Sequence, residues 1–135
     1  MYSAAWGPLS LTVAFGVVVL AAEKPPAEYQ NAMKAIGAAQ ASLRGNVTSK
    51  NYEGVVRDAA TMKASFGTAE RFWSARNVQD ALGHAKAAAK AAADLEAAAA
   101  ARNDEGIAAA QRAVMSTCMS CHMAHRERLP DGTFE

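Results

Sequence analysis

The sequence lacks features that several common functional classes require. Its formal net charge is only +1, and it has no basic run and no basic patch interleaved with aromatic residues, so we expect no nucleic-acid partner. No segment has the pattern of a credible β-strand. No separate acid–base or nucleophile constellation stands out, so an enzyme is not expected.

The composition nevertheless predicts a folded protein. Hydrophobic residues make up 51% of the 135 residues and charged residues 20%, which is typical of a single globular domain. Alanine is the commonest residue, with 34 copies. Alanine favours helix and has little bulk, so helices can approach closely but bury little apolar area. We therefore expect a larger group to fill the middle of the fold.

The amino-terminal 22 residues carry no charged side chain and contain a nearly continuous apolar run, Leu9 to Ala22, directly before the charged and proline-rich residues 23–26. This pattern predicts a signal peptide, cleaved after Ala21 or Ala22. The alternative is a retained amino-terminal anchor, because no Lys or Arg precedes the run and residues 4–22 are long enough to span a bilayer. Both interpretations place residues 23–135 outside the cytoplasm, in the periplasm, and only the second brings the chain to a membrane.

Residues 23–135 are predicted to form an all-α domain. Helical spacing of apolar residues indicates helices at about 27–44, 48–67, 77–101 and 103–128. Gly45 is expected to end the first helix and Gly67 the second, which leaves Phe72 and Trp73 in a connection. The connections are short, so neighbouring helices should be antiparallel and form a four-helix bundle.

Near the carboxyl end the chain contains the pattern C-x-x-C-H, formed by Cys118, Cys121 and His122. On a helix these positions share one face, so two thiols can form thioethers with one haem while the histidine ligates its iron. This spacing also argues against the disulfide that two cysteines in an exported protein would otherwise suggest. A thioredoxin-like pair would need a strand before the helix, and a zinc site would have only His84 and His125 as further nitrogen ligands. We therefore expect one covalently bound haem c, held by the carboxyl-terminal helix.

The position of the motif on the last of four helices resembles the class II c-type cytochromes, the cytochrome c′ family. Arg126 stands four residues after the histidine, as a basic residue does in that family, and Met33 and Gly37 match the spacing of its distal position. The resemblance covers about residues 27–128. The chain departs from the family in a shorter link between the second and third helices, and in Tyr29, where a basic residue is common.

The resemblance implies a periplasmic electron carrier whose iron is ligated by His122 and Met33, with redox proteins as partners. Arg126 is expected to contact a haem propionate or the proximal side of the haem. Met62 is the rival for the sixth ligand, and a homodimer is left open. Two alternative functions remain: a five-coordinate haem protein that binds nitric oxide or carbon monoxide, and a membrane-anchored haem subunit of a larger redox complex.

Overall fold

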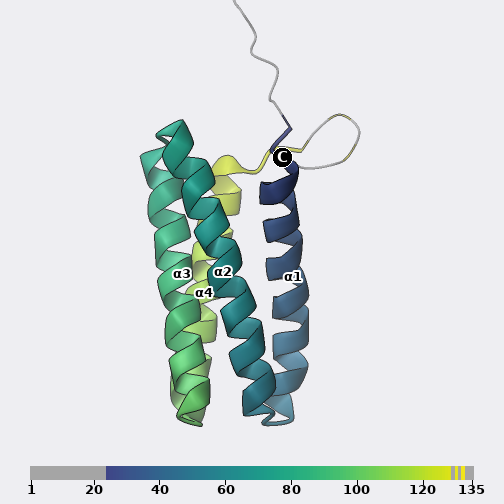
Figure 1. Ribbon diagram of the computed structural model, residues 1–135, viewed down its shortest axis with the longest axis vertical. Coiled ribbons are helices and arrows are strands. Elements are labelled where there is room, and N and C mark those ends of the chain that lie inside the picture. The colour runs from purple at the N-terminus through teal and green to yellow at the C-terminus, as the bar shows by residue number, and fades with distance from the viewer. Residues whose placement is uncertain (1–23, 129, 131, 133–135) are drawn as a thin grey trace, which may run out of the picture.

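The computed structural model describes residues 24–128, 130 and 132, and it contains four helices (Figure 1). They are α1 (Ala27–Thr48), α2 (Tyr52–Arg76), α3 (Gln79–Ala100) and α4 (Asp104–His125). The described part of the chain has no strand, and the predicted all-α, antiparallel four-helix bundle is confirmed. The proposed signal peptide or anchor, residues 1–22, lies outside the described residues. Within the described part, no helix is long and apolar enough to cross a membrane.

Two of the predicted helix ends were wrong. α1 continues through Gly45 to Thr48, and the carbonyl of Gly45 accepts hydrogen bonds from the amide and the hydroxyl of Ser49, at 3.0 and 2.9 Å. α2 begins at Tyr52 and passes through Gly67 to Arg76 without interruption. A single glycine weakens a helix only slightly, so packing on neighbouring helices decides where the helix ends. Phe72 and Trp73 consequently belong to the last turns of α2.

The connections between helices are tight turns, each built on one residue with left-handed backbone. These residues are Lys50, Asn77 and Arg102, with φ values of 55, 55 and 54°. In two of the turns an asparagine follows as the N-cap: Asn51 accepts the amide of Gly54, and Asn103 accepts the amide of Gly106. Turns this short reverse the chain direction at once and make consecutive helices antiparallel.

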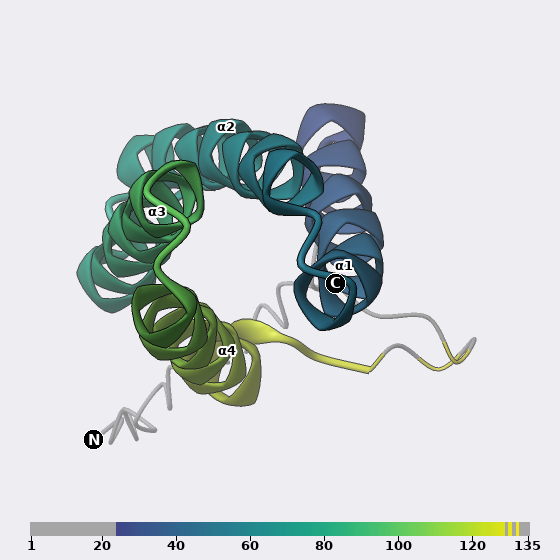
Figure 2. The same ribbon diagram turned by 90° about the horizontal axis from the view of Figure 1, so that it is seen from below.

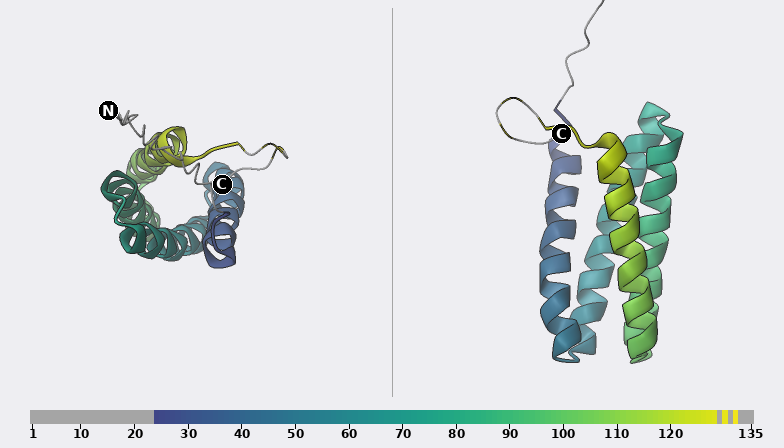
Figure 3. Two further views of the ribbon diagram at one scale, coloured as in Figure 1. Left: turned by 90° about the horizontal axis from the view of Figure 1, so that it is seen from above. Right: turned by 180° about the vertical axis from the view of Figure 1, so that it is seen from behind.

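Seen from below, the helices follow one another around a ring in chain order (Figure 2). Each helix packs on the next, but no Cα atom of α1 lies within 8 Å of a Cα atom of α4. In the rear view of Figure 3, α1 and α4 flank this side of the bundle, with α2 visible between them. We call this the α1–α4 side; it is the one place where two neighbouring helices of the ring do not pack closely.

The core is filled by the chain's own side chains. Its largest fully buried members are Leu43, Met62, Leu95, Val55 and Val114, while α3 contributes mainly buried alanines. Small pockets of about 90 and 20 Å³ lie between the helices. The buried alanines of α3 let the helices approach closely, and the expectation that a larger group fills the middle stays a prediction.

Candidate functional site

α4 carries the cysteines on the side that faces the bundle. Ile107, Ala110 and Val114 are buried at helical spacing along this helix. Cys118 and Cys121 continue the same stripe one and two turns later, and both are half-buried. The sequence prediction that the thiols share one helical face therefore agrees with the burial pattern of α4.

Both thiols are protonated at neutral pH. Burial raises the pKa of Cys118, and a hydrogen bond from Gln40 opposes this effect only in part, with Nε2 3.6 Å from Sγ. Burial also raises the pKa of Cys121, and charge repulsion from the thiolate form of Cys118 and from Asp80 raises it further. The two cysteines are free, with no disulfide. They are therefore available as neutral thiols at the α1–α4 side.

His122 is the exposed member of the motif. Neighbouring protein atoms nevertheless remove enough water from its ring to lower its pKa, and the positive charge of Arg126 lowers it further. Arg126 directly follows α4, and its amide donates to the carbonyl of His122 at 3.1 Å. A lowered pKa keeps the imidazole neutral, which is the form that can ligate a metal.

α1 faces this region from across the α1–α4 side. The contact between Gln40 and Cys118 shows which parts of α1 and α4 lie at the same height along the bundle. Because the helices are antiparallel, Met33, two turns before Gln40, lies toward the same end of the bundle as His122. Met33 is half-buried and packs against the core, whereas Met62 on α2 is completely buried within it. Of the two methionines, Met33 is therefore the one beside the α1–α4 side.

A cluster of rings closes the end of the bundle next to the motif. It consists of Tyr29, Phe72, Trp73 and His125, which we call the end cluster. Tyr29 lies 4.0 Å from Phe72 and 6.0 Å from Trp73, and Trp73 lies 5.2 Å from His125, measured between ring centroids. The side chain of His125 is only 19% exposed, and its Nε2 lies 2.7 Å from Asp80 Oδ2. The sequence pattern did not predict this cluster, because it indicated a connection between helices at Phe72 and Trp73.

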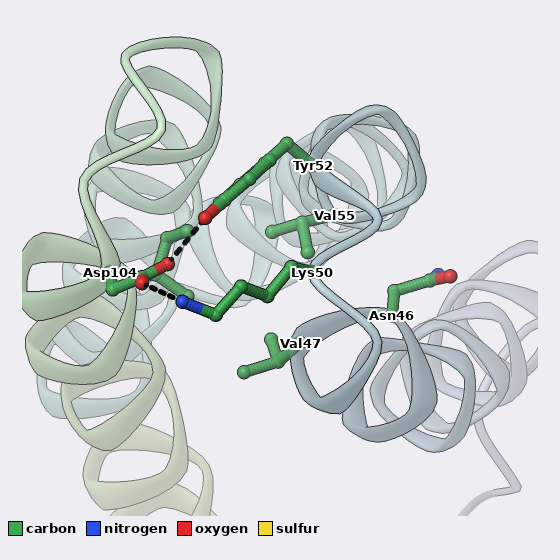
Figure 4. Close-up of a pocket in the computed structure, with 7 residues that line it drawn as sticks. Asn46, Val47, Lys50, Tyr52, Val55 and Asp104 are labelled. Atoms are coloured by element: carbon green, nitrogen blue, oxygen red, sulfur yellow. Dashed lines mark hydrogen bonds and ion pairs between the residues drawn. The ribbon is translucent and has the colours of Figure 1, made fainter.

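The opposite end of the bundle has a different character. There Asp104 accepts hydrogen bonds from Tyr52 and Lys50, each at 2.8 Å, beside the larger of the two pockets (Figure 4). These bonds hold the α1–α2 turn against the start of α4. These hydrogen bonds lie at the other end of the helices from the cysteines. They connect two turns of the bundle and form no part of the proposed ligand site.

The motif residues match the donor set of a covalently attached haem better than that of a single metal ion. No group of three or more His, Cys, Asp or Glu residues in the described part of the chain could hold a metal ion. Haem attachment instead needs two thiols and an imidazole spread along one helix face. Cys118, Cys121 and His122 have that arrangement on α4, beside the side of the bundle where α1 and α4 do not pack closely.

Comparison of the chain with family models, with curated proteins and with solved structures gave no match. The C-x-x-C-H motif and the geometry of α4 are therefore the features that point to a function.

Proposed function

We propose that the protein is a monohaem c-type cytochrome that carries electrons. The observation that carries this proposal is the C-x-x-C-H motif on α4, with two half-buried neutral thiols and an exposed imidazole at the α1–α4 side. Covalently bound haem would supply a one-electron iron centre. The compartment that suits such a protein is the periplasm, given the apolar run in residues 1–22.

The chain's own residues would have distinct roles in this protein. Cys118 and Cys121 would hold the haem through two thioether bonds, because each S–H can add across one vinyl double bond, with sulfur on one carbon and the hydrogen on the other. His122 would ligate the iron through its neutral ring, and Arg126 would contact a propionate or the proximal side. Tyr29 and Trp73, from the end cluster, limit access of water at this end of the bundle.

Met33 is the sixth ligand in our proposal. It lies on α1, toward the end of the bundle that carries His122, and it is only half-buried. Met62, in contrast, is completely enclosed in the core and would have to leave it. A thioether ligand together with an imidazole would raise the reduction potential and would leave no coordination site for a substrate, which favours electron transfer over catalysis.

One observation favours a second candidate function. Met33 packs against the core in this structure. If it stays there when haem is attached, the iron keeps an open site and the protein binds nitric oxide or carbon monoxide instead of only transferring electrons.

Mass spectrometry and visible spectroscopy test the proposal together. The protein exported by a host that matures c-type cytochromes should carry one haem per chain, and the double variant Cys118→Ala/Cys121→Ala should carry none. An intact mass equal to that of the bare polypeptide would refute the proposal. A low-spin ferric spectrum and slow carbon monoxide binding support the electron carrier, while a high-spin spectrum with fast binding supports the second candidate.

Paired methionine variants identify the ligand. Met33→Ala should convert the iron to high spin, whereas Met62→Ala should destabilise the fold by about 2–5 kcal/mol through the cavity it leaves and keep the spectrum. Loss of the low-spin spectrum in Met62→Ala alone would assign the ligand to α2.

A further inference from the structure

The large apolar side chains that remain exposed in the described part of the chain all lie on one stripe of one helix. They are Met115, Met119 and Met123 on α4, with exposed fractions of 39, 60 and 83%. Their spacing of four residues places them on consecutive turns. We call these three residues the methionine face. Single exposed apolar residues are ordinary, but three aligned ones on the helix that carries the cysteines require an explanation.

Only positive charge borders the methionine face along α4. The sequence contains no Asp or Glu from Gly106 to Arg126. This range covers α4 after its first two residues, together with the residue that follows the helix. Arg112 lies seven residues before Met119, so it shares the side of the helix that carries Met119, and it is exposed. Arg126 directly follows α4 and is also exposed. Arg44 of α1 lies beside Met115, where both line the smaller pocket. Neither Arg44 nor Arg112 has a carboxylate partner within the described residues.

This composition is that of a protein interface. Interfaces are enriched in Met and Arg and depleted in Lys, Glu and Asp relative to the remaining surface. Methionine side chains also adapt to different partners because they are unbranched and flexible. The arginines add long-range attraction for negative charge, which raises the rate at which a partner with that charge arrives.

We propose that the methionine face is the docking surface for an acidic redox protein, whose apolar centre covers the methionines while its carboxylates meet Arg44 and Arg112. Met119 lies in the chain between the two cysteines, so a partner seated here reaches the helix that holds the haem. That the partner is a redox protein rests on the proposed function, whereas its acidic and apolar chemistry rests on the surface itself.

Two other occupants fit the surface less well. A second copy of the chain, related by a two-fold axis through this face, would place one arginine-bordered surface against another, and the like charges would repel. A lipid surface usually engages Trp, Phe or Leu together with basic residues, but the methionine face has no aromatic member.

The test measures electron exchange with a defined probe, a blue-copper protein that carries an acidic surface patch, by stopped-flow absorbance over a range of ionic strength. Arg112→Glu should slow the reaction roughly tenfold at low salt and progressively less at high salt. Arg57→Glu makes the same charge change on the exposed face of α2 and should alter the rate less than about twofold. The double variant Met119→Gln/Met123→Gln should slow the reaction several-fold at every salt concentration, whereas Met119→Leu should retain the wild-type rate.

Haem content and the visible spectrum of each variant are measured first. A chain without haem refutes the proposed function, and docking is then measured as equilibrium binding of the same copper protein by calorimetry. Equal effects of Arg112→Glu and Arg57→Glu would overturn the docking proposal. The docking proposal would also be overturned if Met119→Gln abolished a dimer seen in sedimentation, or abolished binding to phosphatidylglycerol vesicles. Either result would assign the face to a different occupant.

Discussion

At the scale of single residues, His125 and Asp80 join the last turn of α4 to the first turn of α3. The hydrogen bond from His125 lowers the pKa of the Asp80 carboxyl below its ordinary value, and the amide of Ala81 lowers it further. A carboxyl whose pKa is depressed in the folded state stabilises that state above its unfolded pKa, near 3.9. This stabilisation is lost as the pH falls through the lower, folded value.

We therefore expect Asp80→Asn to make the stability of the protein less sensitive to acid. Urea unfolding from about pH 5 down to about pH 2 should show a smaller decrease in stability for Asp80→Asn than for the wild type. Asp94→Asn is the control, because Asp94 pairs with Lys90 within α3 and does not connect two helices. An equally steep decrease in Asp80→Asn and the wild type would show that the pair does not stabilise the bundle.

Two glycines of α1 test where the haem lies. A methyl group built on either Gly37 or Gly45 would meet no atom within 4 Å. Gly37 is one turn after Met33, whereas Gly45 is three turns after it. If haem lies against α1 at Met33, Gly37→Leu should lower haem incorporation or disturb the visible spectrum, while Gly45→Leu should do neither. Equal effects of the two variants would show that the haem does not lie against Gly37.

The sequence was most informative where a short motif fixes the spacing of residues. The C-x-x-C-H spacing predicted that Cys118, Cys121 and His122 lie on neighbouring turns of one helix, and the structure places all three on α4; the haem they are proposed to hold stays a prediction. Trp73 and His125 could not be brought together in this way. Their contact depends on how far α2 extends and on how α2 meets α4, which are properties of packing and leave no local pattern.

At the scale of elements, glycines have opposite roles in two neighbouring helices. Gly45 sits inside α1 beside open space, whereas a methyl group on Gly54 would come within 2.5 Å of Asn46 and within 2.6 Å of Asn51. Asn51 caps α2 and also donates to Asn46 at 2.9 Å. The sequence predicted that α1 ends at Gly45, but the structure ends α1 at Thr48, because the preference of glycine for helix ends is weaker than the packing of another helical turn.

These environments predict opposite outcomes for the same substitution. Gly45→Ala should stabilise the protein by about 0.5–1 kcal/mol, because alanine loses less backbone entropy in a helix. Gly54→Ala should destabilise it by about 1 kcal/mol, the usual cost of losing an N-cap, since Asn51 must move. Thermal or urea unfolding of both variants measures the difference. Stabilisation by Gly54→Ala would show that the cap can rearrange without loss.

At the scale of the whole molecule, the ring of helices is unevenly supported. α2 and α3 each pack against two neighbours, while α1 packs closely only on α2 and α4 only on α3. The up-down topology could be predicted from short connections, but the missing contact between α1 and α4 could not. The alanine-rich α3 packs closely on both α2 and α4, whereas α1 packs only on α2.

This arrangement predicts how haem attachment changes the dynamics of the chain. In Cys118→Ala/Cys121→Ala, amides of α1 and α4 should exchange hydrogen faster than amides of α2 and α3, because fewer packed contacts resist their opening. Attachment in the wild type should slow exchange in α4, which holds the haem, and also in α1 if Met33 ligates the iron. Exchange measured by mass spectrometry for wild type, Met33→Ala and the double variant separates these effects. Protection of α1 that appears in the wild type and is lost in Met33→Ala supports ligation across the α1–α4 side. Exchange in α1 that is the same in all three proteins would show that the haem is attached to α4 without joining it to α1, and would exclude Met33 as the ligand.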